Sequence, residues 1–422
     1  MNRLKRGTDS ENSQKSVRSV DCESGVFSAM LYKNATKGMK PKQKVQSRAF
    51  QELWLDLAGE ISYRHCAKML NRFLHRGPGS CVSPTTLEER VESFGKSLSE
   101  GYVARADGIL KSFNIHDGII TTESSVPSSI LNPELPAVID EKQIRQLITD
   151  YNRGRECSTK LKYGDQASNI ESSTQKCCYI SIDDIGVKYQ KPSRKDKRKK
   201  DRKYVENTVI HIQAEDRQYT LTAIGMDKAF KLLVAFLLEN RLMEDYRLVF
   251  FTDGAVCIRD NINKYFGFRQ HTIILDWLHL EKKCYQLMSM AIKGTNAEKD
   301  DIKKTLCAIL WTGRFDKAIK HLDGIKKANI KSDKNLDEVK AYIKRKSPNL
   351  TCYALRSKLG LRISSNRVEK ANDMVVASRQ KHNGMSWSID GSGALATITA
   401  ARINGELRFW IKDKTIPFKF AC

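Results

Sequence analysis

The sequence has no apolar run long enough to cross a bilayer, which excludes a protein anchored by transmembrane helices. The best candidate, residues 230–238, is short and typical of a buried helix segment. Arg3, Lys5 and Arg6 make the N-terminus basic, but no apolar stretch follows them, so we expect no signal peptide. These absences predict a cytoplasmic protein without a membrane partner.

The sequence also lacks any Cys-x-x-Cys pair. Its eleven cysteines are scattered, and Cys177 and Cys178 lie inside an apolar run typical of a strand. An odd, unpatterned set of this kind indicates reduced thiols in a cytosol. Neither a disulfide framework nor a zinc site is expected.

Acidic residues are scarce relative to basic ones. Lys plus Arg exceeds Asp plus Glu by 73 − 49 = 24 in 422 residues. A surplus of this size predicts an anionic partner, and nucleic acid is the usual one. An acidic membrane surface is less favoured, because no long basic amphipathic helix is present. The length predicts two or three domains, and the 40% of apolar residues provides for a core.

The N-terminal third predicts helices that bind DNA. Residues 1–40 are polar and aperiodic, which predicts a disordered or weakly ordered tail, and residues 44–100 look helical. After a break at residues 76–80, Ser83 is a good N-cap and Pro84 fits the first helical position. This order is typical of a helix-turn-helix, or of an ordinary helical pair, and the basic composition favours DNA. The second helix would contact DNA through its N-terminal residues Thr85, Thr86 and Arg90.

The rest of the chain alternates between strand and helix patterns. Residues 113–174 are rich in Ser, Thr, Pro and Asn, which predicts a linker, with a short helix at 141–151. The pattern that follows predicts three strands, a helix, a strand, a helix and a strand, at residues 177–187, 205–213, 218–224, 228–240, 247–253, 260–265 and 271–276. Helices are then expected over 277–356 and at 366–378 and 392–403. This order predicts an α/β fold.

Three acids occupy the predicted strand ends. Asp183, Asp253 and Asp276 each lie at or near the C-terminal end of an apolar strand, the edge that carries active sites in open α/β sheets. Buried carboxylates need a positive partner, and oxygen ligands suit Mg²⁺ or Mn²⁺. Two such ions, roughly 4 Å apart, support phosphodiester chemistry. Glu369 is the best further candidate ligand, on a helix returning to the sheet edge. A single strand-end aspartate is more often a cap or turn residue, but three in order in a basic chain favour a metal site.

Two adjacent aspartates, Asp183 and Asp184, could each be the first acid of the candidate site. Asp183 and Asp184 point to opposite faces of their strand, and the pattern alone does not choose between them. A run of nine Lys or Arg against two Asp follows at residues 191–203. It indicates phosphate contact near the acids, a solvated hairpin tip or an import signal, and the neighbouring acids favour phosphate contact. Its candidate DNA-binding residues are Lys195, Lys197, Arg198, Lys199 and Lys200.

Several motifs together resemble the DDE transposases of bacterial insertion sequences. They are Asp-Asp-Ile-Gly-Val-Lys-Tyr-Gln at 183–190, Phe-Thr-Asp-Gly-Ala at 251–255, Leu-Asp-Trp-Leu-His-Leu-Glu-Lys-Lys at 275–283, Asn-Arg-Val-Glu-Lys at 366–370 and Arg-Gln-Lys-His-Asn-Gly-Met-Ser-Trp-Ser at 379–388. Each motif alone is moderately specific, and their order and spacing are stronger. The first two acids are 253 − 183 = 70 residues apart, and the third lies 369 − 253 = 116 further on, which leaves room for a helical insertion.

The resemblance implies a ribonuclease H-like core of three antiparallel strands followed by parallel strands, with helices on both faces. It implies Asp183, Asp253 and Glu369 as the catalytic, metal-binding acids, with Mg²⁺ or Mn²⁺ as cofactor, and it favours Asp183 over Asp184. The predicted segments are a tail (1–40), a helix-turn-helix domain (41–112), a linker (113–174), the first part of the core (175–276), a helical insertion (277–360) and the rest of the core with the C-terminal segment (361–422).

The activity implied is metal-dependent cleavage at the ends of an insertion sequence, followed by strand transfer into target DNA. The partners would be double-stranded element ends and target DNA, with a homo-oligomer joining two ends in the nucleoid. The alternatives are a non-catalytic helix-turn-helix regulator with a decayed core, or another nuclease of this fold, such as a junction resolvase.

Further residues carry weaker expectations. Arg379 and Lys381 are candidate DNA contacts beyond the third acid, whereas Trp387 is more often a core residue than a base-stacking one. Asp276 and His279 are secondary candidates for metal or DNA contact. They are at least as well explained as residues that cap and order the helix after them.

Overall fold

The computed structural model describes residues 4–5, 44–45, 48–73, 81–133, 141–155, 160–162, 176–190, 204–381 and 385–421. The described residues fall into two compact units. Unit 1 draws on Met1–Tyr102, Val187–Val205 and Met374–Pro417, and unit 2 on Val103–Gly186, Glu206–Asp373 and Phe418–Cys422. These units do not coincide with the six predicted segments. Most of the predicted tail lies outside the described residues, although Leu4–Lys5 (β1) pairs antiparallel with Lys44–Val45 (β2).

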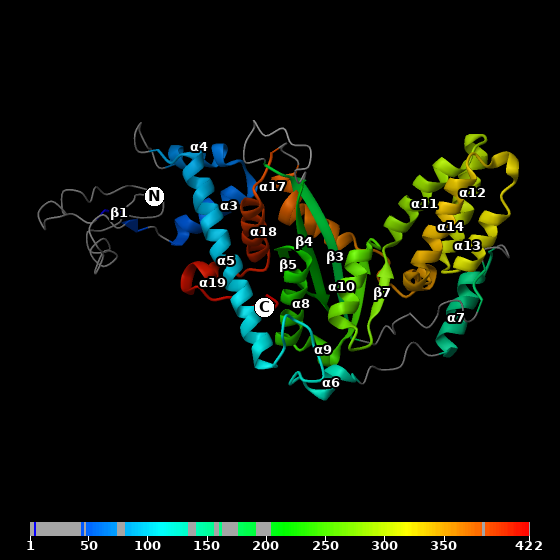
Figure 1. The fold of residues 1–422 in the computed structure, drawn as a ribbon, viewed down its shortest axis with the longest axis horizontal. Coiled ribbons are helices and arrows are strands. Elements are labelled where there is room, and N and C mark those ends of the chain that lie inside the picture. The colour runs from blue at the N-terminus through cyan, green and yellow to red at the C-terminus, as the bar shows by residue number, and fades with distance from the viewer. Residues whose placement is uncertain are drawn as a thin grey trace, which may run out of the picture. The chain divides into compact units, whose positions relative to one another are not determined.

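A mixed five-stranded sheet is the centre of unit 2. Its strands stand in the order β5-β4-β3-β6-β7. Strands β4 and β5 pair antiparallel, and β3, β6 and β7 run parallel to one another (Figure 1). Their bounds are Cys177–Lys188 (β3), Tyr204–Ala214 (β4), Arg217–Ile224 (β5), Arg247–Thr252 (β6) and Thr272–Leu275 (β7). The predicted α/β class and the mixed sheet are therefore confirmed.

Helices α8 (Met226–Glu239) and α10 (Val256–Phe266) cover one face of the sheet. The ring of Phe236 in α8 stacks on Tyr219 of β5, with centroids 4.1 Å apart. Phe266 in α10 packs on Phe250 of β6, with centroids 5.1 Å apart. Because side chains alternate along a strand, the neighbour Phe251 points to the opposite face.

Helices α15 (Tyr353–Lys358) and α16 (Asn366–Asn372) contact that opposite face. The guanidinium of Arg356 lies 5.7 Å from the ring centroid of Phe251, and Asn372 reaches Asp183 on β3. Phe251 also contacts Tyr179 of β3, with ring centroids 6.2 Å apart. Asp183 shares this face with Tyr179, because the two residues are four positions apart on one strand.

Four helices follow β7 and lie beside one another (Figure 1). Their buried apolar side chains form one core. They are α11 (Trp277–Ala291), α12 (Asn296–Trp311), α13 (Phe315–Asp323) and α14 (Asp333–Lys346). Thr295 and Glu298 form a capping box that starts α12. The core is continuous with Phe251 and Leu275 of the sheet, so this segment is tied to the ends of β6 and β7.

The remaining elements of unit 2 are short. They are α6 (Ser128–Leu131), α7 (Glu141–Asn152), α9 (Leu242–Asp245) and the 3₁₀ turns Lys327–Asn329 and Ser347–Asn349. A π-helical turn, Asp373–Ala377, continues α16 into α17 (Ser378–Gln380), and from Met374 onward this segment belongs to unit 1. The predicted helix at 366–378 therefore contains a local change of helix type.

Helices build unit 1. They are α3 (Arg48–Glu60), α4 (Tyr63–Phe73), the first part of α5 (Pro84–Ser112), α17, α18 (Ile389–Ile403) and α19 (Leu407–Asp413). A Cβ on Gly95 of α5 would lie 2.6 Å from the Cα of Ala394, so glycine permits the close approach of α5 and α18. Within the described ranges, no helix combines the length and apolar character that a membrane crossing needs.

Candidate active site

Three aspartates stand in one row at the carboxyl edge of the parallel strands. Paired residues of β3 and β6 differ by 70 in number, as in Ser181 and Phe251, and Asp183 and Asp253 differ by the same 70. Paired residues of β6 and β7 differ by 23, as in Thr252 and Leu275, and so do Asp253 and Asp276 (276 − 253 = 23). The register therefore carries Asp183, Asp253 and Asp276 to neighbouring positions. Asp253 and Asp276 directly follow their strands, whereas β3 continues to Lys188.

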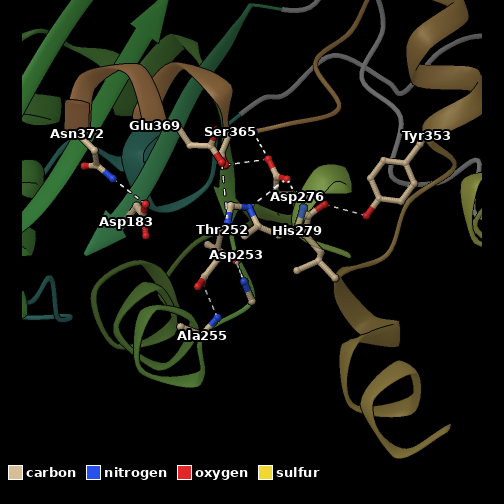
Figure 2. Close-up of polar contacts among 12 residues, drawn as sticks. Asp183, Thr252, Asp253, Ala255, Asp276, His279, Tyr353, Ser365, Glu369 and Asn372 are labelled. Carbon is tan, nitrogen blue, oxygen red and sulfur yellow. Dashed lines mark hydrogen bonds and ion pairs between the residues drawn. The ribbon is translucent and has the colours of Figure 1, made fainter. Parts of the chain in front are cut away.

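Asp183 is the member of the adjacent pair that faces this site. Its Oδ2 accepts a 2.6 Å hydrogen bond from the Asn372 side chain on α16 (Figure 2). Burial, followed by the negative charge of Asp253, raises the pKa of Asp183 to about 6. Asp184 points to the other face, where it accepts a 2.6 Å bond from the hydroxyl of Thr208 on β4.

Asp253 begins a tight turn whose backbone is shaped by Gly254. Asp253 Oδ1 accepts a 2.7 Å bond from the N–H of Ala255. Gly254 has φ +85°, and a Cβ there would lie 2.7 Å from Leu275 Cδ1, so both conformation and space require glycine. The Lys346 ammonium, at the end of α14, donates to the Gly254 carbonyl. A lysine of the helical segment thus contacts the turn that carries the second acid.

Asp276 ties three elements together. It is fully buried, with 0% exposure, and caps α11 by accepting the His279 N–H at 2.8 Å. Its Oδ2 accepts the Ser365 N–H and, at 2.8 Å, the Ser365 hydroxyl at the start of α16. Burial alone would raise the pKa of Asp276, but the bonds from His279 and Ser365 outweigh it and hold the pKa below its usual value. Asp276 therefore caps α11, as expected, and it also accepts hydrogen bonds from Ser365 at the start of α16.

His279 lies among the carboxylates. Its Nδ1 is 3.2 Å from Asp276 Oδ1, and its Nε2 is 3.8 Å from Glu369 Oε1 (Figure 2). The Asp276 carboxylate, followed by the charges of Glu369 and Asp253, raises the pKa of His279 against the opposing effect of burial. The imidazole also lowers the pKa of Asp183. His279 is the one basic side chain that interacts with all four acids of this site among the described residues.

The donor chemistry suits a hard cation. The raised pKa of Asp183 shows that its charge, beside that of Asp253, is not fully balanced by the protein. Mg²⁺ is commonly held by one or two carboxylates, with waters and substrate phosphates completing its shell. In the described part of the chain no group of three or more His, Cys, Asp or Glu side chains is arranged to hold a metal. Asp183 and Asp253 are the two carboxylates here that could hold such an ion, and Glu369 lies against His279. The metal role of each of these three acids stays a prediction.

The predicted recognition residues of the helix-turn-helix belong to unit 1. Thr85 is exposed at the start of α5, and Thr86 and Arg90 are half-buried. The Ser83 hydroxyl accepts the Thr86 N–H at 3.0 Å, which confirms the predicted N-cap. Pro84 is the first residue of α5, as predicted. DNA contact by these residues stays a prediction.

Arg379 does not fit the expected DNA contact. Its side chain is buried, at 2% exposure, and its Nε donates to the Ala58 carbonyl at 3.0 Å. The guanidinium lies about equally over two rings, 5.1 Å from the centroid of Tyr63 and 5.0 Å from that of Trp387. Arg379 is therefore a core residue of unit 1. Trp387 is core as well, since it is buried and its Nε1 donates to a backbone carbonyl, whereas Lys381 is exposed.

The predicted basic run lies outside the described residues. This applies to Lys195, Lys197, Arg198, Lys199 and Lys200.

Sequence reasoning missed three polar residues of the site. Asn372 bonds Asp183, Ser365 bonds Asp276, and Lys346 bonds the turn after Asp253. Asn372 lies three residues after Glu369, on the same helical face, and that spacing is the one signal that could have found it. Ser365 and Lys346 carry no local signal, because their partners are distant in sequence.

No protein-family model matches the chain, and no curated protein or solved structure matches it. Function is therefore argued from the residues and their geometry.

Proposed function

We propose that this protein is a DDE-type DNA transposase. The observation that carries the proposal is the register that aligns Asp183 with Asp253 at the edge of parallel strands, with Glu369 on a helix that returns to the same face. The sequence motifs around these three acids support the same function. The five-stranded order, two antiparallel strands beside three parallel ones, is compatible with a ribonuclease H-like core.

Asp183 and Asp253 would hold Mg²⁺ or Mn²⁺, which when bound activates an attacking oxygen and stabilises the departing one. The residues of this chain prepare that site. Asn372 orients Asp183, the Ala255 N–H orients Asp253, and Asp276 orients His279 and the start of α16. Glu369, beside His279, would complete the acid set.

The proposed reaction has two steps on DNA. Water attacks a phosphorus atom at the element end, the bond to the 3′ oxygen breaks, and that oxygen leaves as a 3′-hydroxyl. The 3′-hydroxyl then attacks a phosphorus in target DNA and displaces a target 3′ oxygen. Neither step needs a covalent protein intermediate or an external energy source, because the first is a hydrolysis that leaves a 5′-phosphate on the flanking strand, and the second exchanges one phosphodiester for another. Two ends are joined, so we propose a homo-oligomer on DNA.

The test uses purified full-length protein and labelled duplexes taken from the DNA that borders the gene. With Mg²⁺ we expect nicking that leaves a 3′-hydroxyl, and joining of that end to a plasmid. Asp183→Asn, Asp253→Asn and Glu369→Gln should each lower cleavage at least about a thousandfold, because each removes a charged group used in the transition state. Binding of the same duplex should stay within a fewfold of wild type.

Asp260→Asn is the matched control, since Asp260 is an exposed acid on α10 paired with Arg259. It should cleave like wild type. Specific binding without any cleavage by wild type would instead support the non-catalytic regulator, and cleavage without strand transfer would support a resolvase-like nuclease. An active Glu369→Gln variant would show that Glu369 is not the third acid.

A further inference from the structure

A buried histidine on the sheet has no hydrogen-bond partner among the described residues. His211 of β4 is 5% exposed, and neither of its ring nitrogens is hydrogen-bonded to any of them. Thr208 contacts Asp184 on the face that α8 and α10 cover, so His211, three positions on, points to the opposite face with Asp183. A buried polar group without a partner costs folding free energy, and its presence calls for an explanation.

Two arginines of the same face interact with His211. The guanidinium of Arg362 lies 4.9 Å from the ring centroid of Tyr179, which shares the face of Asp183. Its buried Nη2 has no hydrogen-bond partner in the part of the chain that the structure describes. Arg367 is on α16, two residues before Glu369. The positive charges of Arg362 and Arg367 both act on His211, and no carboxylate of the described residues does so. Within that part of the chain, three basic side chains therefore converge without an anionic partner.

The three basic side chains differ in their exposure to solvent. His211 is buried, Arg362 is half-buried and Arg367 is exposed, so the arginines are accessible from outside. On β5, the buried Thr222 hydroxyl also lacks a hydrogen-bond partner within the described ranges. It lies on the same face as His211, because Thr222 pairs with Val209, two positions from His211. The available groups are two guanidiniums, an imidazole and a hydroxyl, and all of them can donate hydrogen bonds.

We propose that His211, Arg362 and Arg367 bind a phosphate oxyanion, and that its source is the backbone of a DNA strand. The assignment to DNA rests on the proposed function, whereas the oxyanion chemistry does not. Paired guanidinium N–H groups match the two free oxygens of a phosphodiester. Burial, followed by the charges of the two arginines, lowers the pKa of His211 to about 4, so the ring is neutral near pH 7 and donates from one nitrogen. Because His211 and Asp183 point to the same face of the sheet, the bound phosphate would lie on the face of the catalytic acids.

Binding is tested without metal and without cleavage. Histidine-labelled full-length protein is observed by NMR, and the His211 signal is identified by its loss in His211→Phe. Inorganic phosphate and a duplex of unrelated sequence are added in separate experiments. We expect both to shift the His211 signal and phosphate to raise the melting temperature. A shift with phosphate alone would retain the oxyanion site and overturn its assignment to DNA, and no shift with either would overturn the proposal.

Variants separate binding from a structural role. Arg362→Ala and Arg367→Ala should each weaken duplex binding about tenfold and reduce the salt slope by about one. His211→Phe should lose the phosphate-dependent rise in melting temperature while its stability is unchanged or higher, because the substitution removes an unpartnered polar group. Arg241→Ala, an exposed arginine paired with Glu244, should behave like wild type. Duplex affinity and salt slope unchanged in both arginine variants would overturn the DNA assignment.

Discussion

Asp183 is held where its negative charge lowers the stability of the fold. Burial and Asp253 raise its pKa from 3.8 to about 6, so the folded chain binds the proton more tightly than the unfolded chain. Below pH 3.8 the carboxyl is neutral in both states and costs nothing. As the pH rises through 6, the folded chain must ionise it, and stability is lost by up to about 3 kcal/mol.

We therefore expect Asp183→Asn to stabilise the metal-free protein at neutral pH. The gain should be up to about 3 kcal/mol at pH 7.5 and should vanish near pH 3, where the carboxyl is protonated in both the folded and the unfolded chain. Urea unfolding in EDTA at a series of pH values measures it. Asp260→Asn provides the comparison, because Asp260 is exposed. A stability difference that does not change with pH would contradict the cause assigned to the pKa.

The residue scale also shows where a sequence is informative. Asp183 and Asp253 are predictable because Asp183 lies within an apolar strand pattern and Asp253 directly follows one, and their spacing of 70 is the register of β3 with β6. Arg379 was misjudged because its charge is visible in the sequence, whereas the rings of Tyr63 and Trp387 that enclose it are far away in the chain. The role of His211 could not be predicted, because a histidine within an apolar strand pattern does not indicate which residues contact it.

At the scale of elements, Asp276 connects the end of β7, the start of α11 and the start of α16. We expect Asp276→Asn to lower the free energy of unfolding by about 3 kcal/mol, because an amide cannot accept from both His279 and Ser365 and the partner groups are buried. Hydrogen exchange should quicken at residues 365–372 more than in the sheet. Ser365→Ala keeps the backbone donor and should cost only about 1 kcal/mol. Unchanged exchange at 365–372 would mean that Asp276 acts as a cap for α11 alone.

Element types were predictable where one periodicity dominates. Strands β3 to β7 and helix α8 agree with their patterns to within about two residues, which is the usual spread of element ends. Helix α19 was missed, because seven residues give too few turns for a pattern. The long continuation of α5 to Ser112 was missed as well, since polar residues such as Arg105 and Asp107 mask its apolar stripe. The hydrogen bonds between Ser365 at the start of α16 and Asp276 after β7 could not be predicted from local sequence pattern, because they join residues far apart in the chain.

At the scale of the whole molecule, the surplus of 24 positive charges should govern DNA affinity. Each phosphate that a lysine or arginine neutralises should contribute about 0.9 to the slope of log affinity against log salt. Replacing the basic run by Gln should therefore reduce the slope by up to about four or five and weaken all duplexes alike. The changed residues are Lys195, Lys197, Arg198, Lys199 and Lys200. Titrations from 50 to 300 mM salt measure the slope, and an unchanged slope would show that the run is a solvated tip.

The bond from Asn372 to Asp183 joins residues 189 positions apart, and the bond from Ser365 to Asp276 spans 89. Contacts that close such long intervals form late, after local structure is in place. On the ribosome, the strands that carry the aspartate row are made well before α16, because synthesis proceeds from the N-terminus. A nascent chain thus holds two of its acids in place but lacks the third. Under the proposed function, the order of synthesis itself keeps an unfinished protein from cutting the DNA around it.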